Sequence, residues 1–296
     1  MGRRRPLARD GPVARYAPGH GTGQTGGLQG TLSPFEAISL AKQHGFDALE
    51  LGIADAGSAF GIDATQAQCE DLVAAARKEG VALLSTASGL YWGRALGDDD
   101  PAKSAQARKD LEAMIQIASW LGAKTHLTIP GAVEVFFLPE RPIQDYQGVW
   151  DRATEGLRAV LPLAQEKGVR LGIENVWNKF LLSPLEFAAY IDEFDSPWVQ
   201  AYFDVGNVVL FGYPEDWIRT LNKRIHKVQV KDFKREGYVW NSLPYEGDVN
   251  WPEVRKALQE IGYTGYITEE FPRGDVAWLK ELARRMVLSG KGAASA

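Results

Sequence analysis

The chain has 296 residues, of which 45% are hydrophobic and 24% are charged, and it carries a net charge of −5. This composition is typical of a globular protein with a large core, and the acidic balance argues against nucleic-acid binding. No run approaches the ~18 apolar residues that span a membrane. Cys69 is the only cysteine, which excludes a disulfide and a thiolate zinc cluster and fits a cytoplasmic setting.

The N-terminal segment differs from the rest of the chain. Residues 1–30 are rich in Gly, Arg and Pro, and we expect a poorly ordered arm there. The basic residues Arg3, Arg4 and Arg5 are not followed by an apolar run, so the segment does not look like a signal peptide. Only residues 13–16 faintly resemble a strand ahead of the first helix, which predicts an atypical first strand.

From Ser33 onward, helical patterns alternate with short strand-like runs. Ser33 and Pro34 open the first helix as N-cap and first-turn proline, and this helix runs to about His44. Strands are predicted at 48–53, 81–86, 125–129, 169–174, 199–204, 225–231 and 266–270. Further helices are predicted at about 64–79, 101–121, 146–167, 184–194, 214–222, 251–261 and 276–289.

This alternation predicts one domain. Repeated strand–helix units form a parallel sheet with the helices outside, and the number of helices favours a closed (β/α)8 barrel, a TIM barrel, over an open sheet. No Pro/Gly/Ser-rich linker interrupts the middle of the chain, and barrels of ~250 residues form single domains. We therefore expect the barrel over residues 31–290 and a C-terminal tail over 291–296.

Polar side chains lie in phase at the ends of four successive predicted strands. Residues alternate between the interior and the helix layer of a barrel, and active sites gather at the C-terminal strand ends. Leu171 and Ile173 take the helix-facing positions of their strand, which turns Glu174 inward. The same alternation turns Asp204, Gln229 and Glu270 inward. Lys231 lies on the same inward face as Gln229, two residues further along the strand.

Three carboxylates in a confined space repel one another, and a divalent cation relieves that repulsion. Carboxylate and amide oxygens are hard ligands, which favour Mg²⁺ or Mn²⁺ over zinc. The alternative is that each residue caps its strand or pairs with a lysine. Lys231 has two interpretations of its own, stabilising an oxyanion or neutralising the carboxylates.

Other residues near the predicted strand ends are candidate substrate contacts. Trp92 is placed to stack on a sugar face or to pack in the core, and His126 is placed in a strand where it can line the site. Asn178 and Lys179 follow Glu174 at the mouth of the barrel, where Lys179 either meets a phosphate or is solvated. The sequence contains no dinucleotide fingerprint, no phosphate-binding P-loop and no nucleophile elbow.

Five segments resemble the xylose isomerase-like barrel superfamily, which includes sugar-phosphate isomerases and epimerases, ketose 3-epimerases and endonuclease IV. They are GIENVWNKFLLSP (172–184), YFDVGNV (202–208), KVQVKDFKR (227–235), EGDVNW (246–251) and GYTGYITEEF (262–271). The resemblance covers about residues 33–290. It implies a metal set that falls on Glu174, Asp204, Gln229 and Glu270. Gln229 departs from the pattern, because most relatives have histidine there.

The resemblance and the carboxylates together predict an isomerase or 3-epimerase of a ketose or keto-sugar. In this hypothesis Glu174 and Glu270, roughly across the barrel from each other, move protons on opposite faces of an enediolate. Alternatives are a lyase that cleaves a 3-keto-glycoside by β-elimination, an endonuclease, and a non-catalytic sugar-binding barrel. The expected partner is a small sugar, without nucleic acid or membrane, and a homo-oligomer is among the open alternatives.

Overall fold

Eight parallel strands form one sheet in the computed structural model, which describes residues 14–16, 32–242, 244–270, 281 and 285. In sheet order they are β1 (Ala14–Tyr16), β2 (Ala48–Ile53), β3 (Ala82–Ser88), β4 (Thr125–Thr128), β5 (Arg170–Glu174), β6 (Val199–Asp204), β7 (Ile225–Val230) and β10 (Ile267–Glu269). Because β1 also contacts β10, the sheet nearly closes into a barrel. The predicted TIM barrel is confirmed.

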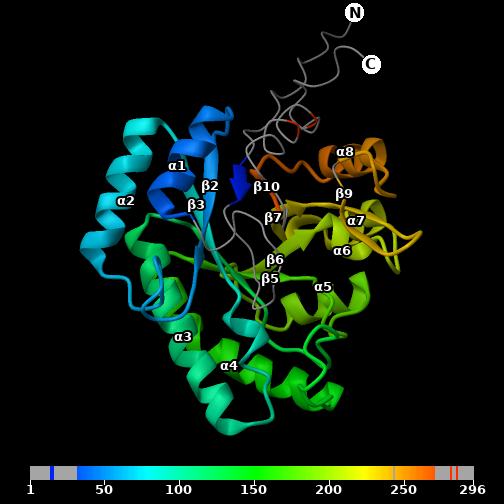
Figure 1. The fold of residues 1–296 in the computed structure, drawn as a ribbon. Coiled ribbons are helices and arrows are strands. Elements are labelled where there is room, and N and C mark those ends of the chain that lie inside the picture. Colours follow the sequence, from blue (N-terminus) through cyan, green and yellow to red (C-terminus); the bar gives the residue numbers. More distant parts are fainter. Residues whose placement is uncertain (1–13, 17–31, 243, 271–280, 282–284, 286–296) are drawn as a thin grey trace, which may run out of the picture.

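Helices surround the strands (Figure 1). They are α1 (Pro34–Gln43), α2 (Gln66–Glu79), α3 (Pro101–Trp120), α4 (Tyr146–Lys167), α5 (Pro184–Asp192), α6 (Val205–Val208), α7 (Pro214–Leu221) and α8 (Trp251–Glu260). Two short 3₁₀ helices, η1 (Leu90–Trp92) and η2 (Asn222–Arg224), and an antiparallel hairpin, β8 (Asp232–Lys234) with β9 (Val239–Ser242), complete the described part.

Local sequence signals set the helix ends. Ser33 forms a capping box with Glu36 at the start of α1, and Thr65 forms one with Gln68 at the start of α2. Gly168 ends α4 with a φ of 67°, a left-handed conformation that glycine adopts without a steric penalty. These caps fix the residues at which α1 and α2 begin and α4 ends.

The two ends of the chain were predicted to be an N-terminal arm and a C-terminal helix with a short tail. Strand β1 lies inside the segment expected to be an arm and pairs with β2 in parallel register, so the barrel begins before residue 31. The rest of that arm, most of the helix predicted at 276–289 and the tail at 291–296 lie outside the described residues. Among the residues described, no helix is both long and apolar enough to cross a membrane.

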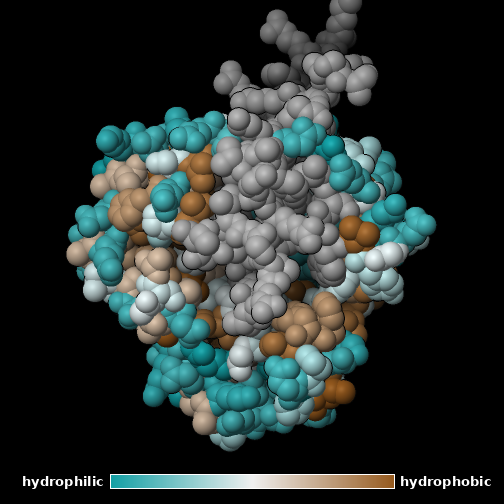
Figure 2. Space-filling model, in the orientation of Figure 1, coloured by the Kyte–Doolittle hydropathy of each residue, from teal (hydrophilic) through white to brown (hydrophobic). Residues whose placement is uncertain are grey.

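The core has an apolar layer between strands and helices and a polar layer inside the barrel. Leu171 and Ile173 are fully buried on the helix-facing side of β5. Inside the barrel, Glu50 accepts hydrogen bonds from Ser85 and from the Tyr202 hydroxyl at 2.6 Å, and Lys227 Nζ lies 3.2 Å from it. This buried polar floor lies beneath the C-terminal strand ends. On the face shown in Figure 2, hydrophilic residues predominate around the rim, with hydrophobic residues between them.

Candidate metal centre

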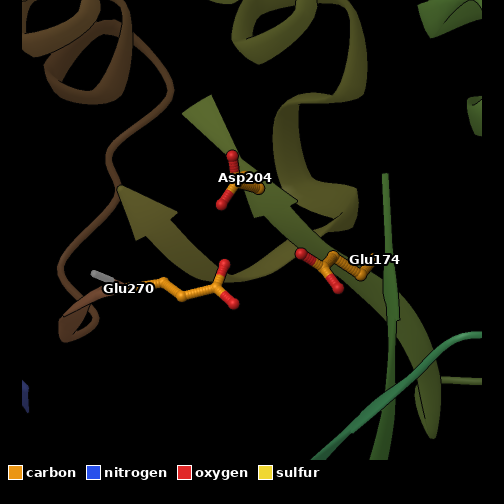
Figure 3. Close-up of side chains that lie close together, drawn as sticks. All are labelled: Glu174, Asp204 and Glu270. Atoms are coloured by element: carbon orange, nitrogen blue, oxygen red, sulfur yellow. The ribbon is translucent and has the colours of Figure 1, made fainter. Parts of the chain in front are cut away.

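Three inward-facing carboxylates meet at the C-terminal ends of neighbouring strands. Asp204 pairs in register with Gln229, and Gln229 pairs with Thr268, two residues before Glu270. One carboxylate oxygen each from Glu174, Asp204 and Glu270 lies within 4.8 Å of the others. The side chains converge from β5, β6 and the end of β10 (Figure 3). The structure therefore brings together the carboxylates selected by strand parity.

Two further residues from β7 and its end join these carboxylates. Lys231 Nζ lies 2.6 Å from Glu270 Oε2 and 3.3 Å from Asp204 Oδ2. Gln229 Nε2 donates to the same Glu270 oxygen at 2.5 Å. We call these five residues, Glu174, Asp204, Gln229, Lys231 and Glu270, the strand-end cluster.

Burial and like charge act together on the cluster. Glu174 is 4% exposed and Asp204 is fully buried. Burial, with the Glu270 charge next in size, raises the pKa of Glu174 well above its usual range. Burial, opposed by Lys231, raises the pKa of Asp204 to about 6. Burial lowers the pKa of Lys231, but the surrounding carboxylates outweigh it and raise that pKa overall. The cluster thus holds more negative charge than one ammonium neutralises.

Two asparagines that the sequence analysis did not select hold the cluster in place. The side chain of Asn175 accepts from the backbone N–H of Asp204 and donates to its carbonyl, both at 2.8 Å, which fixes the end of β5 against the end of β6. Asn207 donates its backbone N–H to Asp204 Oδ1 at 2.7 Å and its side-chain N–H to Glu174 Oε1 at 3.3 Å. Asp204 is the N-cap of α6, and that capping position was the available signal for Asn207.

The donor set fits a divalent metal. Gln229 Oε1 is buried and has no hydrogen-bond donor among the described residues. A buried amide oxygen without a donor is costly unless a cation or water satisfies it. Three carboxylates and one such oxygen are the hard ligands that Mg²⁺ and Mn²⁺ prefer.

Asp232, directly after Lys231, holds the β8–β9 hairpin and the segment that follows it. Its carboxylate accepts from the backbone N–H groups of Tyr245 at 2.9 Å and Val249 at 3.3 Å, and from Trp251 Nε1 at 3.1 Å. A Cβ at Gly247 would lie 2.1 Å from Asp232 Oδ1, so only glycine fits there. The long connection from β7 to α8 is therefore tied down at its origin.

The prediction that His126 lines the site stays a prediction. His126 pairs in register with Leu171, so it shares the helix-facing side of the sheet. Its ring nitrogens lie 2.8 Å from Thr86 Oγ1 and 2.7 Å from the Tyr91 hydroxyl, both buried. Because neighbouring residues of a strand point to opposite faces, the residues on either side of His126 take the inward positions.

Asn178 and Lys179 connect two loops at the mouth. Asn178 is buried; its side chain donates to the Gly131 carbonyl at 2.8 Å and accepts from the Phe180 N–H at 3.0 Å. Lys179 is largely exposed and forms an ion pair with Glu134. These contacts lie outside the strand-end cluster, and the predicted contact of both residues with a substrate stays a prediction.

Trp92 belongs to a chain of aromatic rings on the loops after the strands. It meets Phe137 edge-on at 5.1 Å between ring centroids, and Phe137 meets Phe136 at 5.3 Å. Phe136 lies 6.0 Å from Trp177, which meets Phe233 at 5.2 Å. Trp92 itself is buried, whereas Phe136 and Phe137 are about half exposed. The Trp92 ring is thus largely packed against its neighbours. The exposed rings of this group are those of Phe136 and Phe137.

A family model described as a xylose isomerase-like TIM barrel matches residues 38–287. The chain belongs to this family. Within it, this barrel is 27% identical over 268 residues to the L-ribulose-5-phosphate 3-epimerase UlaE of Salmonella typhimurium, covering 86% of this chain and 90% of the relative.

Solved structures share the fold of this barrel. A D-psicose 3-epimerase crystallised in the presence of D-fructose superposes with a TM-score of 0.73 at 20% identity, covering 88% of this chain and 95% of the other. The IOLI protein, solved with a zinc atom, superposes with a TM-score of 0.69 at 15% identity, covering 87% and 93%. At these identities the likeness shows the fold alone.

Proposed function

We propose that this barrel is a divalent-metal-dependent isomerase or 3-epimerase of a ketose or keto-sugar. The observation that carries the proposal is the strand-end cluster, with three carboxylates whose oxygens lie within 4.8 Å of one another. Two of them, Glu174 and Glu270, are the acid/base pair that proton transfer at a carbon requires. The 3-epimerase relative, which matches over most of both chains, supports the same chemistry.

In this proposal each residue of the cluster has a role. One glutamate of the pair Glu174 and Glu270 removes the proton from the carbon beside the carbonyl, and the other returns a proton. Lys231 is the buried cation nearest Glu270, and it donates a hydrogen bond to negative charge that develops on the substrate oxygen. The carboxylates of Glu174, Asp204 and Glu270 would hold a divalent cation, which would supply polarisation of the carbonyl and stabilisation of that charge. Asn175 and Asn207 hold Glu174 and Asp204 at their separation.

The ligands favour Mn²⁺ or Mg²⁺. Glu174, Asp204, Gln229 and Glu270 supply oxygen only, and the amide of Gln229 replaces the imidazole nitrogen that zinc readily accepts. Trp92 and Lys179 are proposed to contact the substrate outside the strand-end cluster, Trp92 through its ring and Lys179 through its charge.

Isosteric variants of the glutamates test the proposal. For Glu174→Gln and Glu270→Gln, each assayed with Mn²⁺ on ketoses, we expect turnover to fall by about 100-fold or more, because the amide does not accept the proton. Uptake of solvent deuterium at the substrate carbon, followed by NMR, falls with it.

Glu269→Gln is the matched control, because Glu269 pairs with Val230 on the opposite side of β10. It is expected to keep most of the activity. Normal deuterium uptake in both Glu174→Gln and Glu270→Gln would exclude the proposed acid/base roles.

The choice of substrate separates epimerisation from elimination. Free and phosphorylated ketoses are compared with 3-keto-glycosides, and the products are identified by NMR. Epimeric or isomeric ketoses support the proposal, whereas an unsaturated keto-sugar with release of the leaving group identifies the lyase instead.

A further inference from the structure

The ammonium group of Lys231 occupies the strand-end cluster as a cation of the protein itself. Its Nζ contacts Glu270 and Asp204, and the Lys231 side chain is only 8% exposed. Its charge also acts on Glu174, so all three carboxylates share it. A group held this way competes with any other cation for the same oxygens.

The stem of Lys231 is confined by the start of α6. A Cβ at Gly206 would lie 2.4 Å from Lys231 Cγ and 2.6 Å from its carbonyl oxygen. The stem therefore runs directly against the backbone that follows Asp204, where only glycine leaves room. This packing holds the first part of the Lys231 stem in place beside the carboxylates.

The hydrogen bonds of Glu270 show the same competition. Glu270 Oε2 accepts from Lys231 at 2.6 Å and from Gln229 Nε2 at 2.5 Å, which uses both lone pairs of that oxygen. Meanwhile Gln229 Oε1 is buried without a donor among the described residues. A cation that takes the same Glu270 oxygen therefore has to displace these hydrogen bonds.

We propose that Lys231 holds the three carboxylates together in the metal-free protein and is displaced when a divalent cation binds. This rests on the proposed metal-dependent function. A monovalent and a divalent cation within a few ångströms repel strongly in a buried site. Lys231 therefore lowers the affinity for the metal while it keeps the empty site assembled.

The test compares Lys231→Met with Lys234→Met, which removes the same charge three residues along at an exposed position paired with Glu236. Mn²⁺ binding to the full, metal-stripped chain is measured by calorimetry. We expect Lys231→Met to bind Mn²⁺ about tenfold or more tightly than the wild type, because the competing charge is gone. Lys234→Met is expected to bind like the wild type.

A second measurement does not involve metal. Without metal, Lys231→Met removes the positive charge that lies among the three carboxylates, so its unfolding temperature falls and adding Glu270→Gln restores part of the loss. If the metal-free Lys231→Met chain does not fold by circular dichroism, Lys231→Gln replaces it.

The outcomes distinguish the two proposals. If the wild type binds Mn²⁺ but Lys231→Met binds no tighter, the displacement proposal is overturned and the proposed function stands. If no variant binds Mn²⁺, the metal-dependent function fails, and the proposal that Lys231 holds the carboxylates is then decided by the unfolding temperatures alone. An unchanged unfolding temperature in metal-free Lys231→Met overturns that part.

Discussion

Gln229 contributes an amide oxygen to the strand-end cluster. A histidine at the same position would contribute an imidazole nitrogen, which prefers different metals. Its Nε2 donates to Glu270, and its Oε1 points to no donor in the described part of the chain. An amide oxygen is a weaker and harder ligand than imidazole. In the proposed metal site, a substitution at Gln229 is therefore expected to change metal selectivity.

Gln229→His is expected to raise the affinity for Zn²⁺ by about tenfold or more relative to Mn²⁺, because zinc favours nitrogen ligands. Competition with a chromogenic chelator measures both constants on the same metal-free protein. Gln229→Ala is the control, since it removes the oxygen without adding nitrogen and should weaken both metals. An unchanged Zn²⁺/Mn²⁺ ratio in Gln229→His would mean that this position does not contact the metal.

Strand parity predicted the carboxylates of the cluster but not the residues that support them. Glu174, Asp204 and Glu270 each end a strand whose helix-facing positions are visibly apolar, so their direction was readable. The direction of the His126 side chain was not readable from the sequence. Every residue of β4 is buried, so no exposed residue marks the side of the strand that faces the helices. Asn175 acts through the backbone of a neighbouring strand, a relation that one-dimensional periodicity does not contain.

At the scale of elements, the turn from β6 into α6 packs directly against the Lys231 side chain at Gly206. Gly206→Ala is expected to lower the free energy of unfolding by about 1–3 kcal/mol, because the new methyl group would overlap the Lys231 stem. Denaturant unfolding measures it. Gly93→Ala is the control, since its Cβ would meet only the Leu90 carbonyl at 3.7 Å. Equal stability of the two variants would show that Lys231 is not confined there.

Helices and strands were predictable to different degrees. Capping signals and proline gave α1, α4 and α7 almost to the residue, because helix ends depend on local hydrogen bonds. The hairpin of β8 and β9 was missed, since the charged run after β7 lacks alternation and its pairing depends on the anchor at Asp232. Strand β1 was barely detectable because three residues carry too little pattern.

Over the whole barrel, the polar floor beneath the cluster buries an ion pair that is costly to break. Glu50 and Lys227 are 1% and 5% exposed and bound to each other. Burial lowers the pKa of Lys227, opposed by the Glu50 charge. Neither group has access to solvent if its partner is removed, so the pair is costly to break.

Lys227→Met is expected to lower the free energy of unfolding by about 3–5 kcal/mol, because it leaves Glu50 buried and unpaired. The double variant Glu50→Leu/Lys227→Met is expected to recover more than half of that loss. Lys234→Met, in an exposed pair, should cost less than about 1 kcal/mol. Chemical denaturation measures all three, and a double variant no more stable than Lys227→Met would contradict the account.

The anchoring of the β7–α8 connection at Asp232 has a consequence for how the hairpin tolerates change. Both the departing and the returning chain are held by one carboxylate at the barrel wall. We therefore expect substitutions at the exposed tip around Tyr238 to leave the strand that bears Gln229 in place.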